Sequence, residues 1–239
     1  MPKYSQDPIV EAVLGISFDG LDPGEIAEVR TTMSSVLKEY KVLRELPGDE
    51  EEPKEDASSE LRQSEYGGFA LEMGNKSVHI RPDEFSFHWQ KPYISWEVFF
   101  PEAIRCWDIF FGKYPQLKLD SLFVRYVNSI LVPVGEDGKV EFEKFFYNTP
   151  VVPRMNGSKL EQFTNHSLID FKERGIHVII TQTTLDAKKS GTPFILDINV
   201  HNHAETANSD VKSLFNEFRI IKNDVFEQLI SEDCRRLIR

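Results

Sequence analysis

Two histidines near the end of the chain form the pattern most typical of metal chemistry. They close the segment D-I-N-V-H-N-H at positions 197–203. Alternate side chains of a β-strand share a face, so Asp197, His201 and His203 would lie together. Two imidazoles on one face can share a metal ion, and the Asp197 carboxylate can add an oxygen ligand or orient an imidazole. The same alternation, with Ile198 and Val200 entering a core, also describes the solvent face of an antiparallel sheet.

Arg125 is a second candidate because it lies in the apolar run F-V-R-Y-V-N at positions 123–128. A guanidinium inside an apolar strand needs an acid or a bound anion, since an unpaired buried charge is costly. Asp197, on another apolar strand, is the obvious partner for a structural ion pair. The alternative is a ligand-binding site at Arg125 and Asp197, in which Arg125 anchors a small anion.

The familiar catalytic motifs are absent from the sequence. It contains no G-x-x-x-x-G-K-[ST] phosphate loop, no G-x-G-x-x-G after a strand, no G-x-S-x-G turn and no H-E-x-x-H. The S-x-x-K match at positions 35–38 falls inside an amphipathic helix and lacks its partner signatures. No catalytic residue and no cofactor are therefore assigned, and the interpretation leans away from an enzyme.

The first half of the chain alternates strands and helices. Asp22, Pro23 and Glu25 form a helix start, with a capping residue, a proline at the first helical position and a capping box. In residues 84–90 the large aromatic side chains share one face, which predicts core packing. The expected strands are 10–18, 69–73, 77–79 and 84–90, and the expected helices run from 22 to 40 and from about 96 to 113.

The second half predicts one long strand, a short helix, a three-strand meander and a terminal helix. His166 and His177 fall on neighbouring meander strands. Three arginines at the end of the terminal helix complement its dipole. The long strand is 117–134, the short helix 140–147, the meander strands 160–172, 176–186 and 193–203, and the terminal helix 210–238. The arginines are Arg235, Arg236 and Arg239.

This order favours an α+β fold, because strands and helices are segregated rather than strictly alternating. We expect mostly antiparallel sheet packed against two to three long amphipathic helices. The first half is compatible with a ferredoxin-like or split unit, followed by the meander and the terminal helix. The sequence shows no internal repeat and no Gly/Ser linker, which predicts one composite domain over residues 1–239, with a sub-boundary near 135–157.

The net charge of −11 is concentrated in one segment. Residues 47–64 are acidic and almost free of apolar side chains, which predicts a flexible loop. The overall negative field repels nucleic acid and argues against it as a partner. The chain has no run of apolar residues long enough for a membrane span, no secretory segment and only two cysteines. These features predict a cytoplasmic protein without membrane contact.

Four short motifs resemble an uncharacterised, sporadically distributed prokaryotic protein family. They are P-I-V-E-A-V at 8–13, V-R-Y-V-N at 124–128, F-I-L-D-I-N-V at 194–200 and F-E-Q-L-I at 226–230. Asn199 and Ser129 depart from the family pattern, which has an acid at the first position and a more basic or polar residue at the second. The family has no established activity, so the resemblance implies a shared fold and a prokaryotic source rather than a mechanism.

The sequence therefore favours a non-catalytic binding or protein-interaction module, with a homodimer through a sheet edge or the terminal helix as one form of it. The alternative is a metal-dependent hydrolase or nuclease built on His201, His203 and Asp197. A weaker alternative is a protein that binds a small anionic ligand through Arg125.

Overall fold

A computed structural model describes most of the chain. The described residues are 7–48, 67–135, 140–149, 162–186, 191–202 and 210–239. His203 lies outside them, and so does nearly all of the acidic segment 47–64. No helix within these residues is long and apolar enough to cross a membrane.

The chain forms two compact units that interleave along the sequence. Unit 1 comprises Met1–Val13, Gln90–Tyr93 and Ser121–Arg239, and unit 2 comprises Leu14–Trp89 and Ile94–Asp120. The first strand, β1 (Ile9–Phe18), contributes its first half to unit 1 and its second half to unit 2. Much of the span 135–157, near which the sequence predicts a sub-boundary, lies outside the described residues; residues 135 and 140–149 belong to unit 1.

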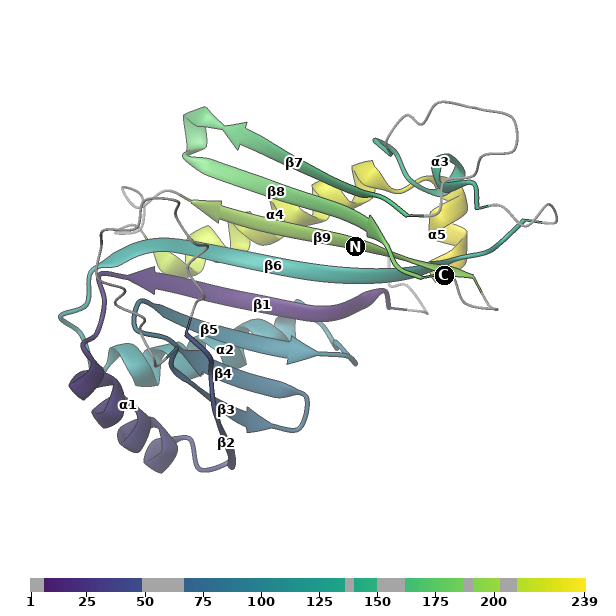
Figure 1. Ribbon diagram of the computed structural model, residues 1–239. Helices are drawn as coiled ribbons and strands as arrows, with labels where there is room; N and C mark the ends of the chain where they lie inside the picture. The colour runs from purple at the N-terminus through teal and green to yellow at the C-terminus, as the bar shows by residue number, and fades with distance from the viewer. Residues whose placement is uncertain (1–6, 49–66, 136–139, 150–161, 187–190, 203–209) are drawn as a thin grey trace, which may run out of the picture. The chain divides into compact units, whose positions relative to one another are not determined.

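Unit 2 is an antiparallel sheet with two long helices (Figure 1). Its strands follow the order β2-β3-β4-β5 and end on the second half of β1. The elements are α1 (Pro23–Val36), β2 (Val42–Glu45), β3 (Phe69–Met73), β4 (Lys76–Ile80), β5 (Glu84–Gln90) and α2 (Trp96–Phe111).

Unit 1 contains the first half of β1 followed by the order β6-β9-β8-β7, also antiparallel. The predicted three-strand meander is present as β7, β8 and β9. Helix α4 lies against β9. The elements are β6 (Leu119–Val132, of which 121–132 belong to this unit), α3 (Phe142–Phe145), β7 (Thr164–Phe171), β8 (Ile176–Thr184), β9 (Thr192–Asn202), α4 (Val211–Leu229) and α5 (Glu232–Ile238).

The element order repeats, although the sequence shows no repeat. A strand, a helix, an antiparallel meander and a second helix follow one another in β1-α1-β2-β3-β4-β5-α2, where the meander has four strands, and again in β6-α3-β7-β8-β9-α4, where it has three. In both series the opening strand neighbours the last strand of its meander. The described nine strands are thus antiparallel throughout, and the predicted α+β fold is confirmed.

Local chemistry explains where α1 begins. The Asp22 side chain accepts a hydrogen bond from the Glu25 amide, and the Glu25 carboxylate accepts one from the Asp22 amide, each at 2.8 Å. These two bonds satisfy amides that have no partner within the helix. Pro23 occupies the first turn, where its missing N–H costs nothing. The predicted capping box is confirmed.

The aromatic residues of β5 lie in a core beneath α2. The Phe85 ring lies 5.4 Å from the Trp107 ring and 5.5 Å from the Phe110 ring, centroid to centroid. The Phe87 ring lies 5.6 Å from that of Phe99. All five side chains are buried. The alternation of β5 therefore separates a helix-covered aromatic face from a polar face, as the sequence predicts.

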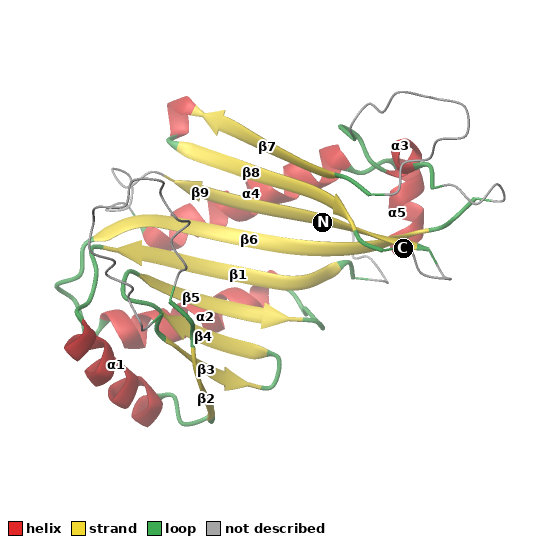
Figure 2. Cartoon of the chain, viewed as in Figure 1, coloured by secondary structure: helices red, strands yellow, loops and turns green. Residues whose placement is uncertain are grey.

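The terminal helix differs from the prediction of one helix over 210–238. It is interrupted after Leu229, and Figure 2 labels α4 and α5 as separate helices. Ile230 is extended and forms a β-bridge with Phe146. Ser231 then caps α5 by accepting a hydrogen bond from the Cys234 amide. Pairing with a segment more than 80 residues earlier breaks the helix, so local periodicity did not reveal it.

Candidate functional site

The polar residues singled out on β9 lie on the sheet face that α4 leaves open. Ile198 and Val200 are fully buried, whereas Asp197, Asn199 and His201 are only partly buried. This is the alternation that the sequence predicts for the segment. The polar face of β9 lies between its two neighbouring strands, β6 and β8, whose side chains on this face can contact it.

Arg125 and Asp197 form an ion pair on this face. The Arg125 Nη2 atom lies 2.6 Å from Asp197 Oδ2, and Nε lies 2.9 Å from the same oxygen. Arg125 stands opposite Asn199 and Asp197 opposite Val127, so the pair is diagonal across β6 and β9. These hydrogen bonds hold the pKa of Arg125 above its ordinary value. The Arg125 side chain is 45% exposed, so it is not the buried cation that the apolar run indicates.

We predict that Arg125→Met lowers the free energy of unfolding by less than about 1 kcal/mol, because half-exposed ion pairs contribute little. A double-mutant cycle with Asp197→Asn in urea unfolding measures the coupling, and we expect about 0.5 kcal/mol. A loss of more than about 3 kcal/mol for Arg125→Met, as for a broken buried pair, would contradict this reading of the pair as a surface contact.

A row of imidazoles and carboxylates crosses the same face. His177 on β8 stands opposite both Asp170 on β7 and His201 on β9. The two imidazole rings are stacked with centroids 5.4 Å apart. His177 Nδ1 lies 3.5 Å from Asp170 Oδ1. His166, the other meander histidine, contacts the Thr181 hydroxyl at 3.2 Å instead. The structure thus brings His177 to His201 and leaves His166 apart from them.

The predicted metal set of His201, His203 and Asp197 is described only in part. Asp197 is engaged by Arg125, and His203 lies outside the described residues. Within the residues that the structure describes, no group of three or more His, Cys, Asp or Glu side chains could hold a metal ion. Metal binding therefore stays a prediction.

Unit 2 carries a histidine cluster that the sequence interpretation missed. His79 on β4 stacks on His88 of β5 with centroids 3.9 Å apart. Ser77 Oγ lies 2.9 Å from His79 Nε2, and Ser86 Oγ lies 3.1 Å from His88 Nε2. In register, each serine faces the other strand's histidine. The signal was present in the sequence, because S-x-H occurs on both strands.

Burial governs the electrostatics of this cluster. Desolvation, followed by the charges of His88, Arg44 and Arg81, lowers the pKa of His79 to about 3. Burial likewise raises the pKa of Glu84 at the start of β5. His79 is therefore neutral at neutral pH, which permits close stacking of the two rings. Strands β4 and β5 correspond in element order to β8 and β9, so each unit has a stacked imidazole pair on equivalent strands.

A buried lysine lies on the helix-covered side of unit 1. Lys222 of α4 is 6% exposed, and its Nζ lies 3.9 Å from the ring centroid of Tyr126 on β6. The Tyr126 hydroxyl contacts that of Tyr93 at 3.2 Å. Desolvation is the main cause that lowers the pKa of Lys222 to about 7; neighbouring Arg219 acts in the same direction, and the acids Asp7 and Glu227 oppose it. Lys222 falls on the apolar stripe of α4, four residues after Phe218, which is a signal that sequence reasoning passed over.

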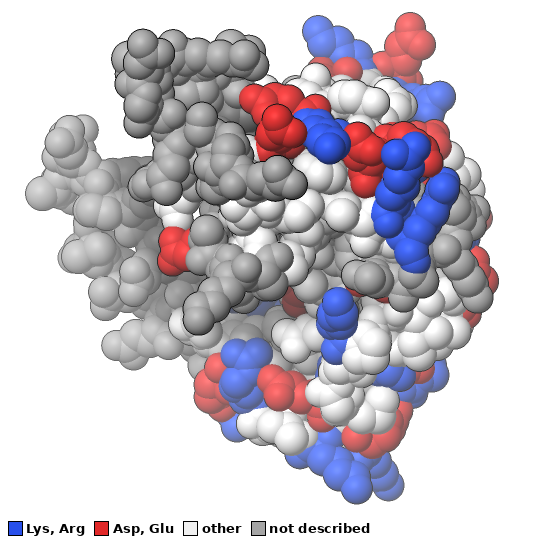
Figure 3. Space-filling model, turned by 90° about the vertical axis from the view of Figure 1, so that its right-hand side faces the viewer, with Lys and Arg blue, Asp and Glu red and all other residues white. Residues whose placement is uncertain are grey.

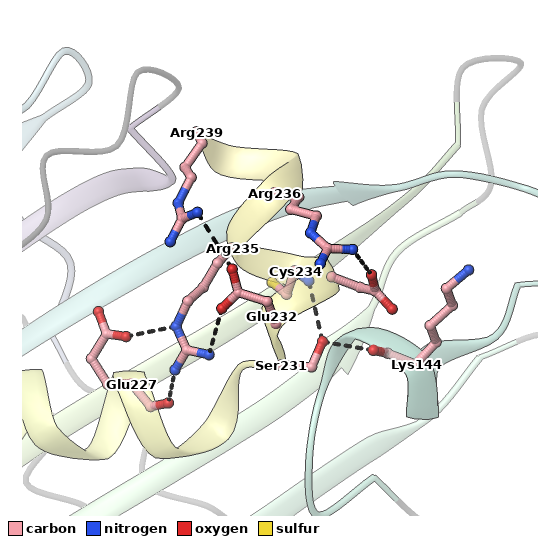
Figure 4. Close-up of polar contacts among 9 residues, drawn as sticks. Lys144, Glu227, Ser231, Glu232, Cys234, Arg235, Arg236 and Arg239 are labelled. Atoms are coloured by element: carbon pink, nitrogen blue, oxygen red, sulfur yellow. Dashed lines mark hydrogen bonds and ion pairs between the residues drawn. The ribbon is translucent and has the colours of Figure 1, made fainter.

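The arginines of the terminal helix are paired with carboxylates (Figure 4). Arg235 Nε lies 3.0 Å from Glu227 Oε2, and Arg236 Nη1 lies 3.0 Å from Asp233 Oδ1. Arg239 contacts Glu232 at 3.4 Å. Acidic and basic side chains are interspersed on the face shown in Figure 3, where the described residues form no continuous basic patch. These arginines therefore act within the chain's own charge network.

The chain matches no protein-family model and none of the curated proteins. The open sheet faces and the strand edges therefore have to be interpreted from their own chemistry.

Proposed function

We propose that this protein is a non-catalytic protein-interaction module that accepts a partner's β-strand at the β7 edge of unit 1. The observation that carries the proposal is the exposure of β7. Among the described residues it pairs with β8 on one side and is the last strand of its unit. Five of its eight residues are exposed, and Leu168 and Ile169 are 63% and 39% exposed.

The backbone of β7 can extend the sheet. The Thr184 amide donates to the Phe163 carbonyl, and these two residues are opposite each other in the β7–β8 register. In an antiparallel pair such hydrogen-bonded pairs alternate along the strand. The odd-numbered residues of β7 therefore bond to β8, while the amides and carbonyls of the even-numbered residues point outward. An exposed edge of this kind adds a partner strand through main-chain hydrogen bonds.

A cytoplasmic location and a relation to the sporadically distributed prokaryotic family are proposed with this function. Cys106 and Cys234 are free and buried, and burial raises the pKa of both thiols to about 12. Unpaired cysteines are the state that a reducing compartment maintains. The family relation rests on the four motifs quoted above.

Native mass spectrometry of protein purified gently from its own host tests the edge function. We expect the wild-type protein to retain a protein partner or a second copy, and Leu168→Lys to lose it, because a lysine on an edge strand blocks strand addition. Ile220→Lys is the matched control, since Ile220 is a 60% exposed apolar residue of α4 in the same unit. Equal retention by both variants, or a bound metal or nucleotide-sized mass in place of a protein, would overturn the proposal.

A further inference from the structure

We infer that the strand bound at the β7 edge is β7 of a second copy of this chain, running antiparallel about a twofold axis at Leu168. This inference rests on the proposed function of the edge and adds the identity of the partner and the register. In this register Leu168 faces Leu168 of the partner subunit, and His166 of each chain faces Asp170 of the other.

The backbone restricts the registers that two β7 strands can form. Hydrogen-bonded pairs across the new interface must use residues whose amides and carbonyls point away from β8, and these are the even-numbered residues. Even-numbered residues must then face even-numbered residues. Their side chains are those of the exposed polar face, so a symmetric pair continues the sheet with both open faces on the same side.

The side chains distinguish among the remaining registers. An axis at Leu168 places the most exposed apolar side chain of β7 against its own copy and forms two His166–Asp170 pairs. An axis at Ser167 would place His166 against leucine and Asp170 against threonine. An axis at Ile169 would place Asp170 against leucine and His166 against Lys172. Opposite charges that face each other across strands stabilise a sheet, and like charges destabilise it.

His166 and Asp170 are each held in place within one chain and keep hydrogen-bonding capacity for a second chain. His166 contacts Thr181 through Nδ1, so Nε2 is directed elsewhere. Asp170 meets His177 through one carboxylate oxygen, at 3.5 Å. Both side chains belong to exposed positions of β7. The edge thus presents a basic and an acidic group symmetrically placed about Leu168, and this self-complementarity selects a second copy over an unrelated strand.

Disulfide trapping tests the register directly. Opposite residues of a hydrogen-bonded antiparallel pair have Cα atoms about 5.5 Å apart, within the range of a disulfide. We expect Leu168→Cys to form a covalent dimer under mild oxidation with oxidised glutathione. Thr164→Cys, at another exposed position of the same strand, faces residue 172 in this register and should give only traces of dimer. The native thiols of Cys106 and Cys234 are buried, so a covalent dimer on a non-reducing gel reports the introduced cysteine in either variant.

Charge exchange provides the second measurement, by analytical ultracentrifugation. His166→Asp replaces two attractive pairs by two repulsive ones and should weaken the dimer about tenfold. Adding Asp170→Lys in the same chain restores opposite charges and should recover dimerisation. Thermal unfolding of each variant verifies that the monomer is folded.

The outcomes separate this inference from the function on which it rests. A protein that stays monomeric at high concentration, but holds a different protein that Leu168→Lys releases, overturns the second-copy inference and leaves the edge function standing. Efficient trapping of Thr164→Cys but not Leu168→Cys overturns the register. If neither Leu168→Lys nor His166→Asp changes the association, both the second-copy inference and the edge function are overturned.

Discussion

Replacement of Lys222 by methionine is expected to raise the free energy of unfolding at pH 6 by about 3 kcal/mol. The amine is buried, and its pKa falls from 10.5 to about 7, mainly by desolvation. That difference corresponds to roughly 5 kcal/mol against the buried ammonium. Loss of the contact between Nζ and the Tyr126 ring offsets about 2 kcal/mol. Methionine keeps an unbranched apolar side chain that can fill the same space.

The gain in the free energy of unfolding from Lys222→Met should depend on pH in a defined direction. The unfolded chain binds a proton on Lys222 below about pH 10.5, whereas the folded protein binds it only below about pH 7. Between these pH values the unfolded state binds more protons than the folded state. The free energy of unfolding of the wild-type protein therefore increases as the pH rises. The advantage of Lys222→Met should therefore be largest below pH 7 and should decrease steadily as the pH rises towards 10.5.

Urea unfolding of both proteins from pH 6 to pH 9.5 measures this difference. Lys212→Met is the matched control, because Lys212 is an exposed lysine on the same helix and its loss should alter stability by less than about 0.5 kcal/mol. Parallel pH profiles for wild-type protein and Lys222→Met would show that Lys222 is not held as a neutral amine.

Phe194→Ala is expected to lower the free energy of unfolding by about 3 to 5 kcal/mol, the usual cost of deleting a buried aromatic side chain. Phe194 on β9 is fully buried, and its ring stacks on that of Phe146 with centroids 3.7 Å apart. The rings of Phe142 and Phe163 each lie 6.0 Å from it. The cavity would open beneath the strand that carries Asp197 and His201.

Chemical unfolding with a constant m value reports this loss. Leu168→Ala serves as the control: this side chain is 63% exposed, so its removal should change the free energy of unfolding by less than about 0.5 kcal/mol while weakening association through β7. Near-equal effects of Phe194→Ala and Leu168→Ala on unfolding would contradict the assignment of Phe194 to the core of unit 1.

The sequence by itself determined the features that depend on neighbours within one turn or a few strand positions. The capping box of α1 joins residues three apart, and its two hydrogen bonds are present. The alternation of β9 depends on the fixed period of a strand, which places Ile198 and Val200 inside and Asp197 and His201 on the open face. Such patterns are local because backbone geometry alone sets their period.

The tertiary structure decided which candidate residues meet. The register of β6 against β9 brings Arg125 within reach of Asp197, and the register of β8 against β9 stacks His177 on His201. The sequence offered Asp197 as the partner of Arg125 but gave no distance and overestimated the burial of the pair. Strand register depends on hydrophobic matching between segments far apart in the chain, so no local window contains it.

The same reason explains the two features of the terminal helix that periodicity did not reveal. The bridge between Ile230 and Phe146 ends α4 at a point where the apolar stripe continues. Lys222 lies on that stripe and is buried because Tyr126, almost a hundred residues earlier in the chain, supplies a ring against its amine. Periodicity indicates which face of an element is covered, whereas only the packed partner decides whether a charge on that face is tolerated and where the helix must end.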